Sequence, residues 1–236
     1  LTALFLTLLL TASCGELPGS EKVKTAALCE ASERDRTDHA AGLLQDGGPV
    51  LILFVDTIFD GDISFLAETD ADAVAFVREV DDPRRFGVAV TDDNGLVTRF
   101  VEKPDSMENK LAVIGMYYIK DSRAMLDAIQ TQMDEDRQTK GEFYLADAFQ
   151  IMVDRGIKFQ VAEVDEWLDA GTSAAVLETN RMLLERGRDN IAGITAEGFV
   201  IIPPVYIHPS AKITNAVIGP YVSLGRNTVV ENCIIR

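Results

Sequence analysis

The segment PVLILFVDT (49–57) decides the fold class of this chain. Residues 50–55 form a continuous apolar run, with Pro49 before it and Asp56 after it. A short apolar run without alternation is typical of a strand buried on both faces, as in a parallel sheet covered by helices. The sequence DGD (60–62) that follows has the composition of a turn. We therefore predict a strand at 50–55 that is buried on both faces and has a polar carboxyl end.

Strand and helix patterns alternate along the chain after this segment. Two β-rich runs, 86–91 and 96–102, flank the turn sequence DDNG, which predicts a hairpin. The other predicted elements are strands at 73–80, 111–119 and 157–164 and helices at 122–133, 143–154 and 173–186. Ser122 and Thr172 are the predicted N-caps of two helices, and Gly187 is the predicted stop of the last one. This alternation indicates an α/β protein with a mostly parallel, doubly wound sheet.

The last segment, residues 199–236, has no helical periodicity. Aliphatic residues recur there at intervals of six in two series, Ile207 and Ile213, then Ile218, Leu224 and Val230. Three such hexads make one turn of a parallel β-helix, in which the aliphatic side chains point into a narrow core and each turn stacks on its neighbours. An unfinished coil end is an exposed sheet edge, so we expect the array to continue beyond Arg236.

The N-terminal stretch LTALFLTLLLTA (1–12) is almost wholly apolar and is followed by Ser-Cys-Gly. Three interpretations remain open: an export signal of the lipoprotein kind, a buried element, or a segment that does not belong to the domain behind it. A signal peptide normally begins with basic residues, but this run begins with Leu1 and none precedes it. Residues 1–35 therefore stay unassigned, and we expect the chain to be a fragment.

The composition excludes several classes of function. The chain has 236 residues, with 22 Lys and Arg against 38 Asp and Glu, and a net charge of −16 disfavours binding to duplex DNA. A nucleotide can still bind an acidic protein through a metal ion. Three scattered cysteines form no disulfide framework or zinc motif. The sequence has no apolar run long enough to span a membrane, and no triad or CxxC arrangement.

Polar residues follow several of the predicted strands, where ligands bind in open α/β sheets. Asp56 ends the first strand and Asp169 lies in WLDAGT, so each could be a magnesium ligand or a turn or helix cap. Glu102 and Lys103, in FVEKP, could bind sugar hydroxyls and a phosphate, or form a solvated hairpin edge. Lys140, in KGEFYLAD, could also contact a phosphate.

Two glycines and two acidic residues complete the set of candidates. Gly87 and Gly115 lie inside strands, where a glycine permits close approach of a ligand or marks a bulge. Glu142 and Asp147 could be helix-start charges that interact favourably with the helix dipole.

Taken in order, the motifs resemble those of sugar-1-phosphate nucleotidylyltransferases, in particular the glucose-1-phosphate thymidylyltransferase-like branch with a left-handed β-helix. The motifs are FVDTIFDGD, RRFGVAV, FVEKP, AVIGMYYI, KGEFYLADA and EWLDAGT, followed by the hexapeptide repeats. The resemblance runs from Pro49 to Arg236. It implies a Rossmann-like nucleotide-diphospho-sugar transferase fold, with a partial nucleotidyltransferase domain at 36–190 and the start of a left-handed β-helix at 199–236.

The resemblance also implies a reaction, in which an NTP and a sugar 1-phosphate give an NDP-sugar and pyrophosphate. We expect dTTP or UTP and glucose 1-phosphate as substrates and Mg²⁺ as the cofactor. Asp56 and Asp169 would hold the metal, and together with Lys103 they form the implied catalytic set. The implied substrate-binding residues are Lys103 and Lys140 at the sugar phosphate, Glu102 at the sugar hydroxyls, Gly87 and Gly115 beside the sugar, and His39 near the base.

One family motif, the phosphate-binding loop GxGTRxxPxT, does not occur in this sequence. Residues 36–40, RTDHA, look like an altered form of the family's GTAHA. We therefore expect weak activity or none from this chain. A non-catalytic sugar-phosphate-binding or regulatory protein and an acyltransferase module in the β-helix, where His208 lies, are the alternatives.

The resemblance bears on location and partners as well. NTPs and sugar phosphates are cytoplasmic substrates, so we expect a cytoplasmic protein with no nucleic-acid or membrane partner. The β-helix could support a homo-oligomer.

Overall fold

The computed structural model describes residues 8–9, 44, 47–192, 194 and 197–236. His39 lies outside the described residues, and so does the segment 1–35 apart from the short strand β1 (Leu8–Leu9). The chain forms two compact units, one that ends at Trp167 and one that comprises Leu168–Arg236.

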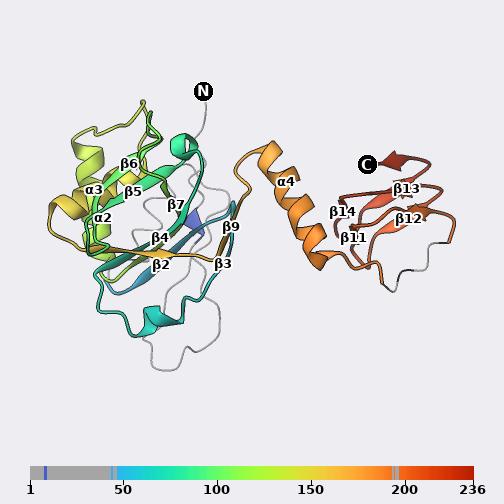
Figure 1. Ribbon diagram of the computed structural model, residues 1–236, viewed down its shortest axis with the longest axis horizontal. Helices are drawn as coiled ribbons and strands as arrows, with labels where there is room; N and C mark the ends of the chain where they lie inside the picture. Colours follow the sequence, from blue (N-terminus) through green and yellow to red (C-terminus); the bar gives the residue numbers. More distant parts are fainter. Residues whose placement is uncertain (1–7, 10–43, 45–46, 193, 195–196) are drawn as a thin grey trace. The chain divides into compact units, whose positions relative to one another are not determined.

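The first unit is built on a sheet that has seven strands among the described residues (Figure 1). After β1 these strands are β2 (Val50–Phe54), β4 (Ala73–Glu79), β5 (Gly87–Thr91), β6 (Val97–Glu102), β7 (Leu111–Ile119) and β8 (Phe159–Glu163). Strands β1, β2, β7, β4 and β8 pair in that order, while β5 pairs with both β6 and β7. Two helices, α2 (Ser122–Asp134) and α3 (Leu145–Asp154), lie between β7 and β8 in the chain. The predicted α/β class is confirmed.

The ladders of this sheet are of both kinds. In its described part, β4 pairs with β8 in parallel, and the other ladders are antiparallel. The alternation of strands and helices in the sequence predicts a mostly parallel sheet, and the share of antiparallel pairs is higher than that. The reason is that β5, β6 and β7 follow one another without a helix, whereas parallel neighbours need a long crossover connection. Helices α2 and α3 provide such a connection only before β8.

Strand β2 is packed on both faces, as its apolar run predicts, but it ends at Phe54, and Val55 is exposed rather than buried. Val50 and Ile52 belong to a core cluster that includes residues of α2 and α3. Leu51 and Leu53 pack against a second cluster, around Phe76 of β4 and other residues of β4 and β7. Both faces of the sheet therefore remove apolar surface from water, which is the main favourable contribution to its stability.

The helix boundaries follow capping chemistry more closely than apolar spacing. Asp121, not Ser122, caps α2, because its carboxylate accepts the N–H of Arg123. Ser122 is instead the first helical residue, and its buried hydroxyl donates to the carbonyl of Leu44. Helix α3 begins at Leu145, two residues later than predicted. The Thr172 cap is confirmed, since its hydroxyl accepts the N–H of Ala175.

Four further short elements lie in the first unit or at its C-terminal boundary. They are β3 (Thr57–Asp60), β9 (Glu166–Asp169), η1 (Ser64–Ala67) and η2 (Pro83–Arg85), and β3 pairs with β9. The predicted hairpin is confirmed as β5 and β6. In its turn the carboxylate of Asp92 accepts the N–H groups of Asn94 and Leu96.

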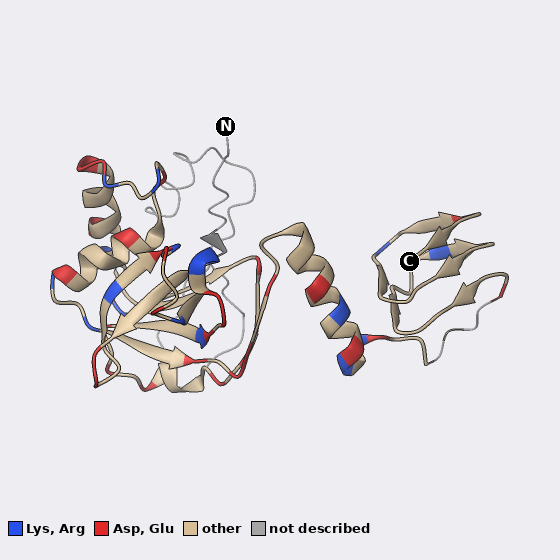
Figure 2. Ribbon diagram, turned by 45° about the horizontal axis from the view of Figure 1, so that its top comes forward, with Lys and Arg blue, Asp and Glu red and all other residues tan. Residues whose placement is uncertain are grey.

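The second unit begins with helix α4 (Ser173–Leu183), which continues into the π-helical turn η3 (Leu184–Arg188). The helical backbone conformation is lost within that turn, at Arg186 and at Gly187, which has φ of 78°, in agreement with the predicted stop at Gly187. Seven short strands follow: β10 (Val200–Ile201), β11 (Val205–Ile207), β12 (Lys212–Thr214), β13 (Val217–Ile218), β14 (Val222–Leu224), β15 (Val229–Glu231) and β16 (Ile234–Ile235). Figure 2 shows that charged residues are few on these strands and more frequent on α4.

The strands coil so that β13, β14, β15 and β16 each lie in parallel on the strand one turn earlier. Val200 pairs with Val217 and Val217 with Ile234, while Val205 pairs with Val222. All these pairs are 17 residues apart, which is one residue fewer than three hexads. Four members of the predicted aliphatic series are buried in the coil: Ile207, Ile218, Leu224 and Val230. The parallel coil agrees with the predicted β-helix, whereas its handedness and a strict hexapeptide repeat stay predictions.

Helix α4 packs onto the coil through polar contacts. The side chain of Asn180 donates to the carbonyl of Tyr221 and accepts from the hydroxyl of Ser223, at 2.8 and 2.6 Å. The Tyr221 hydroxyl donates to Glu185 in η3 at 3.0 Å. Among the described helices of both units, none is long and apolar enough to cross a membrane.

Candidate functional site

Two segments of the first unit bring charged side chains together. The end of β6 supplies Glu102 and Lys103, and the loop before α3 supplies Lys140. The Lys103 ammonium lies 3.8 Å from a carboxylate oxygen of Glu102. The Lys140 ammonium donates to the backbone carbonyl of Lys103 at 3.0 Å. Three of the residues predicted to bind the sugar phosphate therefore lie together.

The backbone of both segments is unusual at the two lysines. Lys103 has φ of 45° and Lys140 has φ of 53°, so both are in the left-handed region. This conformation costs a non-glycine residue about 1–2 kcal/mol. Residues in such sparsely populated conformations cluster at active sites and ligand clamps. The strain is therefore consistent with a functional role for the two lysines.

Tyr144 is a member of this cluster that the sequence pattern did not single out. The Lys103 ammonium donates to the Tyr144 hydroxyl at 3.0 Å and lies 4.7 Å from the centre of its ring. The Tyr144 hydroxyl donates in turn to Glu142 at 2.5 Å. Glu142 precedes α3, so it is not the helix-start charge that was predicted, whereas Asp147 does lie in the first turn.

Residues of α2 and α3 form hydrogen bonds with the loop that carries Lys140, Glu142 and Tyr144. The amide of Gln132, a buried residue of α2, donates to the carbonyl of Tyr144 at 3.0 Å. The carboxylate of Asp147 accepts the hydroxyl of Thr139 at 3.1 Å, and the backbone N–H of Asp147 donates to the carbonyl of Tyr144 at 3.1 Å. The sequence contained no signal for the role of Gln132, because a single polar residue on the apolar face of a helix has many explanations.

The electrostatics of the cluster follow from burial and hydrogen bonding. Burial raises the pKa of Glu102, and the nearby charge of Lys103 works against that rise. The hydrogen bond to Tyr144 is the main reason that the pKa of Lys103 is raised, so the ammonium form is favoured. Burial also raises the pKa of Asp147, while its bond from Thr139 lowers it. The cluster thus combines the Lys103 ammonium, whose charged form is favoured, with the carboxyl groups of Glu102 and Asp147, whose ionised forms are disfavoured by burial.

Glu102 should make the stability of the first unit depend on pH. Because its pKa is raised in the folded chain, stability falls as the pH rises from the ordinary glutamate value of 4.5 through the raised value. The variant E102Q has no such ionisation, so its stability relative to wild type should be on the order of 1 kcal/mol more favourable at pH 7 than at pH 4. Urea unfolding followed by the fluorescence of Trp167, the single tryptophan, measures this difference. Equal differences at the two pH values would contradict the assignment.

The two glycines among the predicted residues are packed against side chains of this protein. A Cβ atom at Gly87 would lie 2.9 Å from a carboxylate oxygen of Glu102 and 3.0 Å from a methyl group of Val113. Gly115 has φ of 77°, and a Cβ there would lie 2.8 Å from the ring of Phe54. Gly87 therefore lets Glu102 lie across the strand. The approach of a sugar to either glycine stays a prediction.

The two aspartates predicted to hold magnesium lie at strand ends. Asp56 is exposed in the turn between β2 and β3. Asp169 is the last residue of β9, and its carboxylate accepts the N–H of Gly171 at 2.8 Å. Of the residues described, no three His, Cys, Asp or Glu form a metal-binding group. Carboxylates of this kind suit Mg²⁺, which usually takes one or two of them and completes its shell with water and substrate phosphates.

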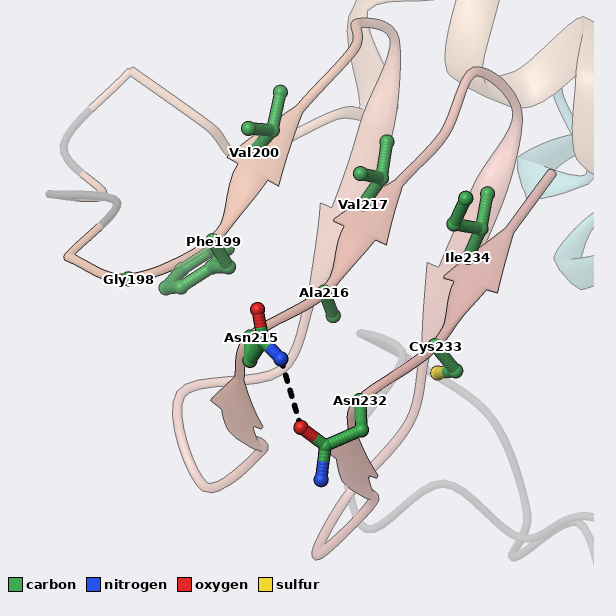
Figure 3. A pocket seen from close by; sticks show the side chains of 9 residues that line it. All are labelled: Gly198, Phe199, Val200, Asn215, Ala216, Val217, Asn232, Cys233 and Ile234. Atoms are coloured by element: carbon green, nitrogen blue, oxygen red, sulfur yellow. Dashed lines mark hydrogen bonds between the residues drawn. The ribbon is translucent and has the colours of Figure 1, made fainter.

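The coil contains an open groove of about 590 Å³ (Figure 3). It is lined by 198–200, 215–217 and 232–234, and none of these residues is charged. The groove therefore has no group that would neutralise a phosphate. His208 lies in a turn of the coil, where its Nδ1 contacts the hydroxyl and the N–H of Ser210 at 2.8 and 3.1 Å.

The sequence is similar to known proteins over most of its length. Residues 36–186 match the family described as nucleotidyl transferase, so the chain belongs to the nucleotidyl transferase family. It is 32% identical over 225 residues to the low-salt glycan biosynthesis nucleotidyltransferase Agl11 of Haloferax volcanii, a match that covers 84% of this chain and 62% of that protein.

Two further relatives carry related names. The chain is 32% identical to a glucose-1-phosphate thymidylyltransferase of Streptomyces antibioticus, over 70% of this chain and 47% of that protein. It is 30% identical to the bifunctional protein GlmU of Halalkalibacterium halodurans, over 80% of this chain and 42% of that protein. The chain thus spans less than two thirds of the length of each of these relatives.

Proposed function

We propose that this chain is part of an enzyme that transfers a nucleotidyl group from an NTP to a sugar 1-phosphate. The products are an NDP-sugar and pyrophosphate. The family match and the names of the relatives support this reaction class. The observation that carries the proposal is the convergence of Lys103, Lys140 and Glu102 at the end of β6. Two cations near a partly buried carboxylate can bind a phosphate and a sugar hydroxyl in one place.

The chemistry of this transfer requires positioning and charge neutralisation more than covalent catalysis. An oxygen of the sugar phosphate attacks the α-phosphorus of the NTP, and the bond from that phosphorus to the pyrophosphate oxygen breaks. Lys103 would offset the negative charge of the attacking phosphate, and Glu102 would orient the sugar. Asp56 and Asp169 are the proposed Mg²⁺ ligands, and the metal would supply Lewis-acid stabilisation of the phosphates.

Glucose 1-phosphate and dTTP or UTP are the substrates we propose, in keeping with the name of the Streptomyces antibioticus relative. The test is a ³¹P NMR assay of the chain with Mg²⁺, glucose 1-phosphate and each NTP in turn. We expect slow formation of NDP-glucose and pyrophosphate in equal amounts, fastest with dTTP or UTP. Binding of glucose 1-phosphate without any turnover would support a non-catalytic sugar-phosphate-binding protein instead. The absence of both would overturn the proposal.

Location, assembly and the β-helix are part of the same proposal. NTPs and sugar phosphates occur in the cytoplasm, and we therefore place the protein there, without a nucleic-acid or membrane partner. The coil could join copies of the chain into a homo-oligomer. An acyltransferase function of the coil is less well supported, because His208 is engaged with Ser210 inside its own turn.

A further inference from the structure

The hydrogen bonds of the Tyr144 hydroxyl form a chain in which Lys103 donates to Tyr144 and Tyr144 donates to Glu142. A phenol has a single proton, and the Tyr144 hydroxyl donates that proton to Glu142. Its oxygen then faces the Lys103 ammonium as an acceptor, at 3.0 Å. The tyrosine ring lies beside the same ammonium, 4.7 Å from ring centre to nitrogen, where a cation is attracted to the aromatic face. The ammonium is thus held by the hydroxyl and the ring of one residue.

We propose that Tyr144 is a positioning residue, oriented by Glu142, that holds the Lys103 ammonium in place for the phosphate of a sugar 1-phosphate. This inference rests on the proposed function and adds a residue to it. A lysine side chain is flexible and carries a point charge, so a lysine that nothing holds in place loses much conformational freedom when it binds an anion. A lysine that is already held loses less. An ammonium has three N–H donors, and the bond to Tyr144 leaves donors for phosphate oxygens.

The surroundings of Tyr144 fit a positioning role. Its carbonyl accepts from the buried amide of Gln132 at 3.0 Å and from the backbone N–H of Asp147 at 3.1 Å. The backbone of Tyr144 is therefore fixed at the start of α3, and Glu142 fixes the hydroxyl. The raised pKa of Lys103, caused first by the Tyr144 hydrogen bond, agrees with this geometry.

The first test needs no activity. Reductive methylation modifies lysine amines, and the rate at each lysine is read by peptide mass spectrometry. In the variant Y144F the rate at Lys103 should rise at least about threefold, because a lysine without this hydrogen bond is deprotonated more readily. The rate at Lys140 should not change. The matched control is Y221F, which removes another tyrosine hydroxyl bonded to a glutamate, in the second unit.

Two outcomes of the labelling would overturn the inference. An unchanged rate at Lys103 would show that Tyr144 does not hold the ammonium. Equal rises at Lys103 and Lys140 would show that the substitution loosens the whole loop, so that Tyr144 has a general structural role.

The second test measures the dissociation constant of glucose 1-phosphate by calorimetry. We expect Y144F to weaken binding about five- to tenfold and Y221F to leave it unchanged, in line with the loss of one charge-assisted contact. In a K103A background, Y144F should have no further effect, because Tyr144 acts through Lys103. Additive effects of K103A and Y144F would overturn the positioning role. If the wild-type chain does not bind glucose 1-phosphate, the proposed substrate fails, and the labelling still decides whether Tyr144 holds Lys103.

Discussion

In the variant Asp56→Asn, the rate of pyrophosphate release that depends on glucose 1-phosphate is expected to be at least about 100-fold lower than in wild type. Asp56 lies two residues after the end of strand β2 and is exposed in the turn that follows, where its carboxylate is accessible to a metal and a substrate. Asparagine has the same shape without the charge, so the fold should be unaffected while the affinity for Mg²⁺ falls. The ³¹P assay, run over a range of Mg²⁺ concentrations, measures the loss.

The matched control is Asp60→Asn, which makes the same change at an exposed aspartate four residues further along. Asp60 lies in β3 and has no role in the proposed reaction, so its variant should keep the wild-type rate. Equal losses in both variants would point to a general effect of surface charge. Full activity of Asp56→Asn would remove Asp56 from the proposed metal site.

Replacing Gly219 by alanine is expected to destabilise the coil by about 3–5 kcal/mol. Gly219 has φ of 98°, and a Cβ there would overlap the carbonyl oxygen of Ile202 and a methyl group of Val205. Val205 is completely buried in the coil, so the overlap cannot be relieved without displacing the previous turn. Hydrogen exchange on the whole chain should show a loss of protection of at least about 100-fold over residues 200–236.

Gly225→Ala is the control for this prediction. Gly219 and Gly225 each follow an aliphatic residue of the repeat, so the sequence pattern treats them alike. A Cβ at Gly225 would meet its nearest neighbour, the Thr228 hydroxyl, at 4.0 Å, which is ordinary contact. Protection in Gly225→Ala should therefore stay within about tenfold of wild type. The strands β4 and β7 of the first unit serve as the internal reference, and equal effects of the two variants would contradict the packing argument.

Sequence patterns predicted the features that depend on neighbouring residues. The apolar run of β2, the hairpin of β5 and β6, and the stacked aliphatic residues of the coil all appear in the structure. Capping was less predictable: Asp121 and Ser122 are adjacent and both favourable at an N-cap, and only the path of the chain decides between them. The mostly antiparallel ladders were also not evident, because strand order and direction depend on distant segments.

In the candidate site, too, some features could be predicted from the sequence and others depend on the tertiary structure. The sequence by itself determined the types of residue that could bind a sugar phosphate, since Glu102, Lys103 and Lys140 stand in recognisable motifs. Only the tertiary structure decided that Lys103 meets Tyr144, because these residues lie 41 positions apart and belong to different elements. The physical reason is that a motif reports local chemistry, whereas a hydrogen bond between distant residues depends on how the whole chain packs.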